Sequence, residues 1–183
     1  METLRRTTDG TIPFRFRLRL RTALLTIAVF PLLLPGHRAL AASPADDPAV
    51  PAILAAAESL FQTMKARDYP GIWAVLTAKS RDTIVSETEE AIRAAGGNPL
   101  PKGEVREDFA AGGPVSRQYW EGFLRHFDPD AALSWSRWEM GAVERDRAEV
   151  LITHRGADRP AVLRMYREGG SWKAGLVETF WLH

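Results

Sequence analysis

The spacing of hydrophobic residues changes along this chain, from a helical period in residues 50–127 to alternation from Leu133 onward. Apolar residues three or four positions apart mark one face of a helix, whereas alternation marks one face of a strand. The pattern therefore predicts an α+β fold, in which N-terminal helices pack on an antiparallel sheet of about four C-terminal strands.

The first predicted helix begins at Asp47-Pro48 and ends near Arg67. Asp47 is the expected N-cap and Pro48 the first helical residue, a position where the N–H that proline lacks has no partner in any case. Asp68-Tyr69-Pro70 ends the helix, because a residue that precedes proline avoids the α conformation. Pro70 then opens a second, short helix. The buried stripe of the first helix consists of Val50, Ile53, Leu54, Ala57, Phe61 and Met64.

Two more helices are predicted on either side of a segment rich in glycine and proline. One covers about residues 80–95, or is divided in two if Ser86 and Glu89 form a capping box. Residues 96–114 hold five glycines and three prolines, and we expect a surface insertion there with room for one helical turn. The other helix covers residues 115–127 with Ser116 as its N-cap, and Asp128-Pro129-Asp130 then forms a turn.

Four strands are predicted at about 133–144, 148–155, 160–168 and 171–181. Gly169-Gly170 is typical of a two-residue hairpin loop, because such turns need positive φ angles that glycine adopts without strain. This loop places Ala161 opposite Glu178, and a four-residue loop at 156–159 places His154 opposite Ala161. Directly opposed residues share a face of the sheet, so His154, Ala161 and Glu178 are expected to form one row on an otherwise apolar face.

The order of these elements, together with several short motifs, resembles the nuclear-transport-factor-2-like (cystatin-like) superfamily over residues 50–182. The resemblance implies a cone, in which a curved antiparallel sheet wraps around helices and encloses a pocket. The superfamily includes isomerase-like and cyclase-like enzymes as well as exported domains without known chemistry. The motifs are Met64-Lys-Ala-Arg-Asp-Tyr-Pro70, Ile72-Trp-Ala-Val-Leu76, Ser80-Arg-Asp82 and Arg167-Glu-Gly-Gly-Ser-Trp-Lys173.

The sequence departs from the compact pattern of the superfamily in two places. The insertion at 96–114 and the aromatic helix at 115–127 are expected to reshape or cover the mouth of the pocket. The Tyr/Asp/Asp set of the isomerases matches no positions in this sequence, so no catalytic residue is transferred from the resemblance.

His154 and Glu178 are the candidate catalytic residues. A carboxylate in an apolar pocket with a histidine beside it can exchange protons with a substrate. The alternative interpretation is a satisfied buried pair, or a Glu178 that binds an arginine such as Arg137. The candidates for the lining of an aromatic ligand pocket are Trp120, Phe123, Trp135 and Ala161, although for any single tryptophan a place in the core is the favoured interpretation.

Residues 1–42 have the pattern of a secretory signal peptide. Alternating arginines from Arg15 to Arg21 precede an apolar stretch over 23–34, and Ala39-Leu40-Ala41 fits a small-x-small cleavage site. The alternative is a retained membrane anchor, but the apolar stretch is shorter than the roughly 20 residues that span a membrane. A cleaved signal is therefore favoured, and no integral membrane segment is expected after cleavage. Residues 43–49 would then be a linker and residues 50–183 the domain.

Charge and composition narrow the possible functions. Residues 1–42 hold seven arginines and two acids, which leaves 17 basic and 21 acidic side chains in residues 43–183. Such an acidic domain is not expected to bind nucleic acid. The absence of cysteine excludes disulfides and thiolate metal sites, and no motif predicts a metal or cofactor.

The sequence therefore favours an exported, periplasmic or secreted domain that binds a small apolar or aromatic ligand or a partner protein. A small isomerase, cyclase or lyase that uses His154 and Glu178 is the first alternative. A structural envelope-interaction domain with a filled cavity is the second. The half-polar outer face of the sheet also offers a surface for a homodimer.

Overall fold

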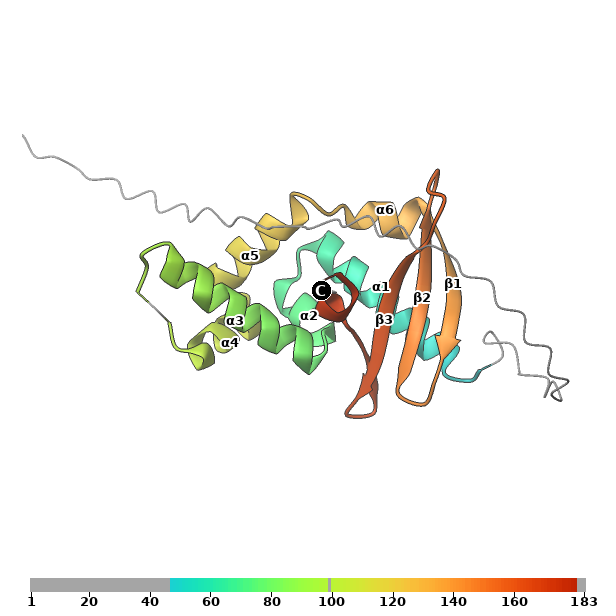
Figure 1. Ribbon diagram of the computed structural model, residues 1–183, viewed down its shortest axis with the longest axis horizontal. Coiled ribbons are helices and arrows are strands. Elements are labelled where there is room, and N and C mark those ends of the chain that lie inside the picture. Colours follow the sequence, from blue (N-terminus) through green and yellow to red (C-terminus); the bar gives the residue numbers. More distant parts are fainter. Residues whose placement is uncertain (1–46, 99, 181–183) are drawn as a thin grey trace, which may run out of the picture.

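The computed structural model describes residues 47–98 and 100–180, and the predicted signal peptide at 1–42 lies outside these residues. Helices precede a four-stranded antiparallel sheet, as the sequence predicts, so the chain has an α+β fold (Figure 1). In chain order the elements are α1 (Val50–Ala66), α2 (Tyr69–Val75), α3 (Ala78–Ala94), α4 (Lys102–Ala111), α5 (Pro114–Leu124), α6 (Pro129–Ser134), β1 (Ser136–Val143), β2 (Arg147–His154), β3 (Ala161–Glu168), β4 (Ser171–Ala174) and α7 (Leu176–Phe180).

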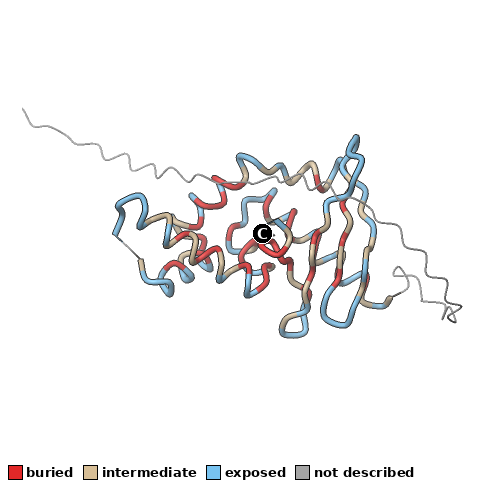
Figure 2. The backbone as a smooth tube through the Cα atoms, viewed as in Figure 1, coloured by how far each residue is buried: buried red, intermediate tan, exposed pale blue. Residues whose placement is uncertain are grey.

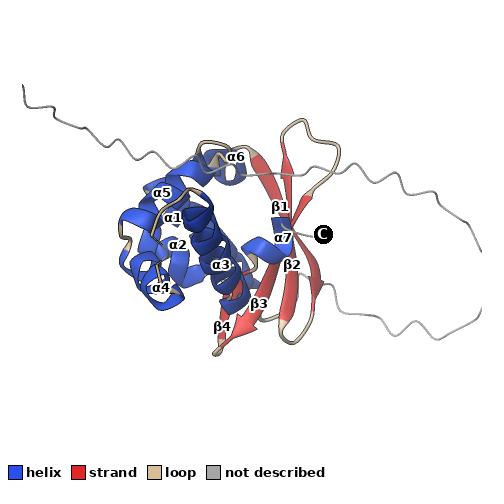
Figure 3. Ribbon diagram, turned by 60° about the vertical axis from the view of Figure 1, so that its left-hand side comes forward, coloured by secondary structure: helices blue, strands red, loops and turns tan. Residues whose placement is uncertain are grey.

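The long helix α1 joins the sheet to the remaining helices. It passes behind the strands in Figure 1 and continues into a helical lobe formed by α2–α5. Figure 3 shows the helices gathered on one side of the sheet. Buried residues alternate along β2 and β3 and gather where the helices meet (Figure 2). The stripe predicted for α1 is buried at Val50, Ile53, Ala57, Phe61 and Met64, with Leu54 half-buried.

The sheet has the order β1-β2-β3-β4, and its register agrees with the prediction in the last hairpin. Met165 pairs with Ala174 there, and Glu168 with Ser171. Between β2 and β3 the register is shifted by two residues, because Ile152 pairs with Ala161 where Leu163 was expected. A shift of two keeps every side chain on its predicted face, since side chains alternate with a period of two. The predicted burial is therefore confirmed although the predicted pairing is wrong.

The last predicted strand is wrong beyond Ala174, where the chain turns at Gly175 and forms α7. A Cβ atom on Gly175 would lie 2.7 Å from Tyr166 Cε2, so the turn depends on the missing side chain. The free edge of β4 meets the α2–α3 connection instead of another strand, since the Thr77 amide donates to the Ala174 carbonyl (3.1 Å). Residue 181, the predicted strand end, lies outside the described residues.

The predicted surface insertion at 96–114 contains a ten-residue helix, α4, which corrects the expectation of one helical turn. Val105 and Phe109 point from α4 into the core and are fully buried. The ring centroid of Phe109 lies 4.9 Å from that of Trp73 on α2 and 5.3 Å from that of Tyr119 on α5. Two apolar residues four positions apart are enough to bury one face of a short helix.

Helix α3 is continuous, so the capping box that would divide it at Ser86 and Glu89 is wrong. The Ser86 hydroxyl instead accepts from Lys102 Nζ (3.0 Å) on α4. Arg106 on the same helix binds Asp82 (2.6 Å). These exposed polar contacts join α3 to α4 along the surface, while the buried face of α4 holds it in the core.

Several helix starts differ from the predictions, although the helices themselves are present. Helix α1 begins at Val50, two residues later than expected, with Ala49 as N-cap. Asp47 Oδ1 accepts from the Ala49 amide (2.8 Å). Ser116 is buried inside α5, and Asp108 of α4 accepts from its amide (2.7 Å). Asp128 opens the short helix α6 where a turn was expected. Within the described residues, the helices are all too short or too polar to cross a membrane.

We predict that Phe109→Ala lowers the free energy of unfolding by about 3–5 kcal/mol, because it removes a fully buried aromatic ring. Urea denaturation would measure the loss. The control is Glu107→Ala, which changes an exposed residue of the same helix and is expected to cost no more than about 0.5 kcal/mol. Similar small losses for both variants would restore the view of residues 96–114 as a surface excursion.

Candidate functional site

A cavity of about 150 Å³ lies between the sheet and the helices α1, α6 and α7. Its walls are mainly apolar, and three phenylalanines from three different segments contribute rings. The Phe127 centroid lies 5.9 Å from that of Phe61 and 6.3 Å from that of Phe180. The cavity is lined by Phe61, Phe127, Asp128, Ala131, Ala132, Ser136, Ile152, His154, Ala161, Leu163, Thr179 and Phe180.

The polar groups at this cavity are mostly occupied by bonds within the fold. The Ser136 hydroxyl donates to the Ala131 carbonyl (2.7 Å), and Asp128 caps α6 by accepting from the Asp130 amide (2.9 Å). Thr179 Oγ1 accepts from the Arg164 amide (3.0 Å). The exposed imidazole of His154 makes no hydrogen bond to residues 47–98 or 100–180 and remains available to a ligand.

Glu178 is buried on α7 and is bound to the start of α3. The Thr77 hydroxyl donates to Glu178 Oε1 (2.9 Å), and the Ser80 hydroxyl donates to Oε2 (2.6 Å). The Val177 amide also donates to Ser80 Oγ (3.1 Å). The two hydroxyls hydrogen-bond the carboxylate, which is the arrangement that a buried charged group requires. This geometry is that of a structural anchor between α3 and α7.

The predicted row of His154, Ala161 and Glu178 does not form. Ala161 pairs with Ile152, His154 pairs with Ser136 on β1, and Glu178 has left the sheet. His154 and Ala161 nevertheless line the same cavity, because the two-residue shift keeps both at one end of the sheet. Glu178 is not among the lining residues, and its neighbours Thr179 and Phe180 take that place. Its alternative partner, Arg137, instead binds Glu139 (3.1 Å).

The predicted aromatic lining is distributed over separate places. Trp120 and Phe123 are buried on α5, with ring centroids 5.8 Å apart, in the core of the helical lobe. Neither lines the cavity. Burial raises the pKa of the neighbouring Tyr119 phenol above its usual range, and the negative charge of Glu87 adds to the rise. Trp135 is 53% exposed, and the Arg155 guanidinium lies 5.7 Å from the centroid of its ring.

Sequence reasoning missed most of the residues that line this cavity. Phe61 was assigned to the core stripe of α1, and Phe127 to the aromatic face of its helix. Their position at a cavity depends on how α1, α6 and the sheet meet, which no local pattern reports. Phe180 was placed in a strand, so its contact with Phe127 had no signal in the sequence.

In the described residues there is no cluster of three or more His, Asp or Glu side chains suited to a metal ion.

Comparison with family models, with curated proteins and with solved structures finds no match for this chain.

We predict that Ser80→Ala lowers the free energy of unfolding by about 1–3 kcal/mol, because it leaves one oxygen of the buried Glu178 carboxylate without its donor. Chemical denaturation would measure this loss. Ser86→Ala is the matched control, since it removes a hydroxyl of the same helix whose Lys102 contact is exposed. An equal effect of the two substitutions would contradict the anchoring role of Glu178.

Proposed function

We propose that this protein is an exported binding module of the nuclear-transport-factor-2-like superfamily, and that the cavity beside Phe127 receives a small apolar or aromatic ligand. The superfamily assignment is supported by the order of helices followed by an antiparallel sheet, and by the motifs around Tyr69-Pro70 and Gly169-Gly170. A pocket between helices and sheet is where that superfamily would bind a ligand.

The observation that carries the proposal is the apolar character of this cavity. Rings and aliphatic side chains from α1, β2, β3 and α7 line it, and water against these walls would have few hydrogen-bond partners. Expelling that water in favour of apolar atoms is favourable. The wall therefore selects for a ligand with an apolar body.

The size of the cavity limits the ligand to about one ring. Binding pockets for drug-sized ligands occupy about 300–1,000 Å³, whereas this cavity measures about 150 Å³. An engineered apolar cavity of about that volume in another protein binds benzene. His154 lies at the exposed end of the cavity, so a polar substituent on the ring would face the imidazole while the ring meets Phe61 and Leu163.

The enzymatic alternative draws less support from this geometry. A proton-transfer pair needs both groups within reach of one substrate. His154 lines the cavity, but the Glu178 carboxylate binds Thr77 and Ser80 on the side of α3. Binding without chemistry is therefore the simpler function for this site.

We predict that Ala161→Leu reduces the affinity for toluene and benzyl alcohol at least about tenfold, because the larger side chain enters the cavity from its exposed end. Ligand-observed NMR titration would measure the binding. Ala157→Leu makes the same change at an exposed loop position outside the cavity and should bind as the unchanged protein does. The proposal fails if neither probe shows saturable binding to the unchanged protein, or if both variants bind equally well.

Export is tested separately by the mass of the protein recovered from the exported fraction. We predict a mature chain that begins near Ala42 or Ser43, because the cleavage pattern precedes these residues. Native mass spectrometry of the same sample would also report a co-purified ligand. Recovery of the uncleaved chain from the membrane fraction would instead support a retained anchor.

A further inference from the structure

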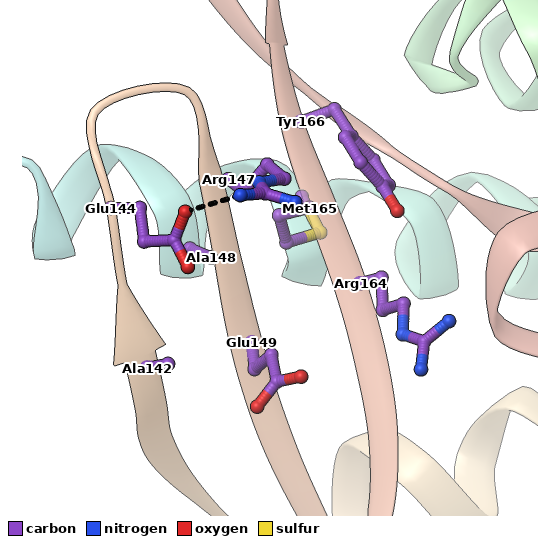
Figure 4. A pocket seen from close by; sticks show the side chains of 8 residues that line it. All are labelled: Ala142, Glu144, Arg147, Ala148, Glu149, Arg164, Met165 and Tyr166. Carbon is purple, nitrogen blue, oxygen red and sulfur yellow. Dashed lines mark hydrogen bonds and ion pairs between the residues drawn. The ribbon is translucent and has the colours of Figure 1, made fainter.

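A second cleft, of about 270 Å³, lies on the sheet near the turn that joins β1 to β2 (Figure 4). The charged side chains in Figure 4 point away from α1, which passes behind the strands. This cleft is therefore separate from the apolar cavity between the sheet and the helices. It is lined by Ala142, Glu144, Arg147, Ala148, Glu149, Arg164, Met165 and Tyr166.

Two of the four charges in this cleft neutralise each other. Arg147 Nη2 donates to Glu144 Oε2 (2.7 Å), and the dashed line in Figure 4 marks this ion pair. The hydrogen bond to Glu144 and the negative charge of that carboxylate raise the pKa of the Arg147 guanidinium. This leaves Glu149 and Arg164 as one negative and one positive group.

Glu149 and Arg164 are held apart although they face each other across β2 and β3. Opposed residues of opposite charge normally interact across strands, yet these two form no ion pair within 4.0 Å in the described part of the chain. The Arg164 guanidinium instead donates from Nη1 to the Glu178 carbonyl on α7 (3.0 Å). One bond uses only part of its donor set, since a guanidinium carries five N–H groups.

Arg164 is held in position before any ligand binds, and the fold leaves room for Glu149 beside it. The Arg164 amide donates to Thr179 Oγ1 (3.0 Å), so both its backbone and its side chain are tied to α7. A Cβ atom on Gly141, in the irregular part of β1, would lie only 3.0 Å from Glu149 Cβ and 3.4 Å from its Oε2. The absence of a side chain on Gly141 therefore leaves room for the Glu149 carboxylate. A group that is already held in place, as Arg164 is, loses less entropy when a ligand binds.

We propose that this cleft binds a free amino acid as a zwitterion. The carboxylate of the ligand would accept from the Arg164 guanidinium, and its ammonium group would donate to Glu149. The cleft has no net charge, because its two arginines balance its two glutamates. A ligand with one charge of each sign satisfies both remaining groups, whereas a simple anion or cation satisfies one.

The uncharged lining indicates an aliphatic side chain. Ala142 and the ring of Tyr166 provide apolar surface beside the charged groups. Leucine is therefore the probe of choice, since it combines the zwitterion with a branched apolar side chain. Two analogues keep the side chain and remove one charge each, namely 4-methylpentanoate, which lacks the ammonium group, and 3-methylbutylamine, which lacks the carboxylate.

NMR titration of the purified protein tests the proposal, with backbone amide shifts in β2 and β3 as the readout. Leucine is expected to bind at least about tenfold more tightly than either analogue, because each analogue loses a charge-assisted hydrogen bond. In Glu149→Gln the advantage of leucine over 4-methylpentanoate should disappear, while the affinity for 4-methylpentanoate itself stays the same. This selective loss distinguishes a ligand contact from a general weakening of the sheet.

Glu139→Gln is the matched control, because Glu139 is an exposed glutamate of the same sheet that does not line the cleft. It should retain the full preference for leucine. The comparison of leucine with its two analogues on the unchanged protein decides the proposal even if Glu149→Gln does not fold. Equal binding of the three compounds, an absence of shifts in β2 and β3, or a preference unchanged by Glu149→Gln would overturn it.

Discussion

The interaction between the Glu178 carboxylate and the hydroxyls of Thr77 and Ser80 determines where the sheet ends. It joins the last described helix to a segment about a hundred residues earlier in the chain. Because Glu178 faces α3, the chain cannot continue beside β3 as a strand and turns at Gly175. The same turn brings Thr179 and Phe180 to the apolar cavity.

The start of α3 is suited to hold such a carboxylate. The first amides of a helix lack partners within it, and the helix dipole favours negative charge there. Thr77 caps the helix, and the Glu168 carboxylate accepts from the Ala78 amide (2.9 Å). Two acidic side chains from the C-terminal part of the chain thus meet one helix start. Glu168 is half-buried, whereas Glu178 is buried and both of its carboxylate oxygens accept hydrogen bonds.

Local patterns in the sequence predicted α1, α2, α3 and α5, the strands up to Ala174 and the buried face of β2, β3 and β4, because these depend on side chains close together in the chain. The helical structure of residues 176–180 could not be predicted in this way. Leu176, Val177 and Phe180 suit a strand as well as a short helix, and a contact with Ser80 decides between them. Helix α4 was missed because its exposed charges outnumber Val105 and Phe109.

The candidate site shows the same limit. The predicted pairing of His154 with Ala161 is wrong, but both residues line the same cavity because the predicted face of their strands was right. Trp120 and Phe123 carried a plausible composition for a ligand site but fill the helical core. The residues that shape the cavity come from α1, α6 and α7 as well as from the sheet. Only the packing of distant segments brings them together.

The interrupted pairing of β1 between Met140 and Val143 also bears on aggregation at high protein concentration. In the described sheet β4 is covered at its edge by the α2–α3 connection, which leaves β1 as the open edge. A flat open edge is a template for intermolecular strand pairing and aggregation. The bulge, with Arg137 and Glu139 beside it, breaks the regular row of amides and carbonyls. Such a break disfavours the addition of a strand from a second molecule at this edge.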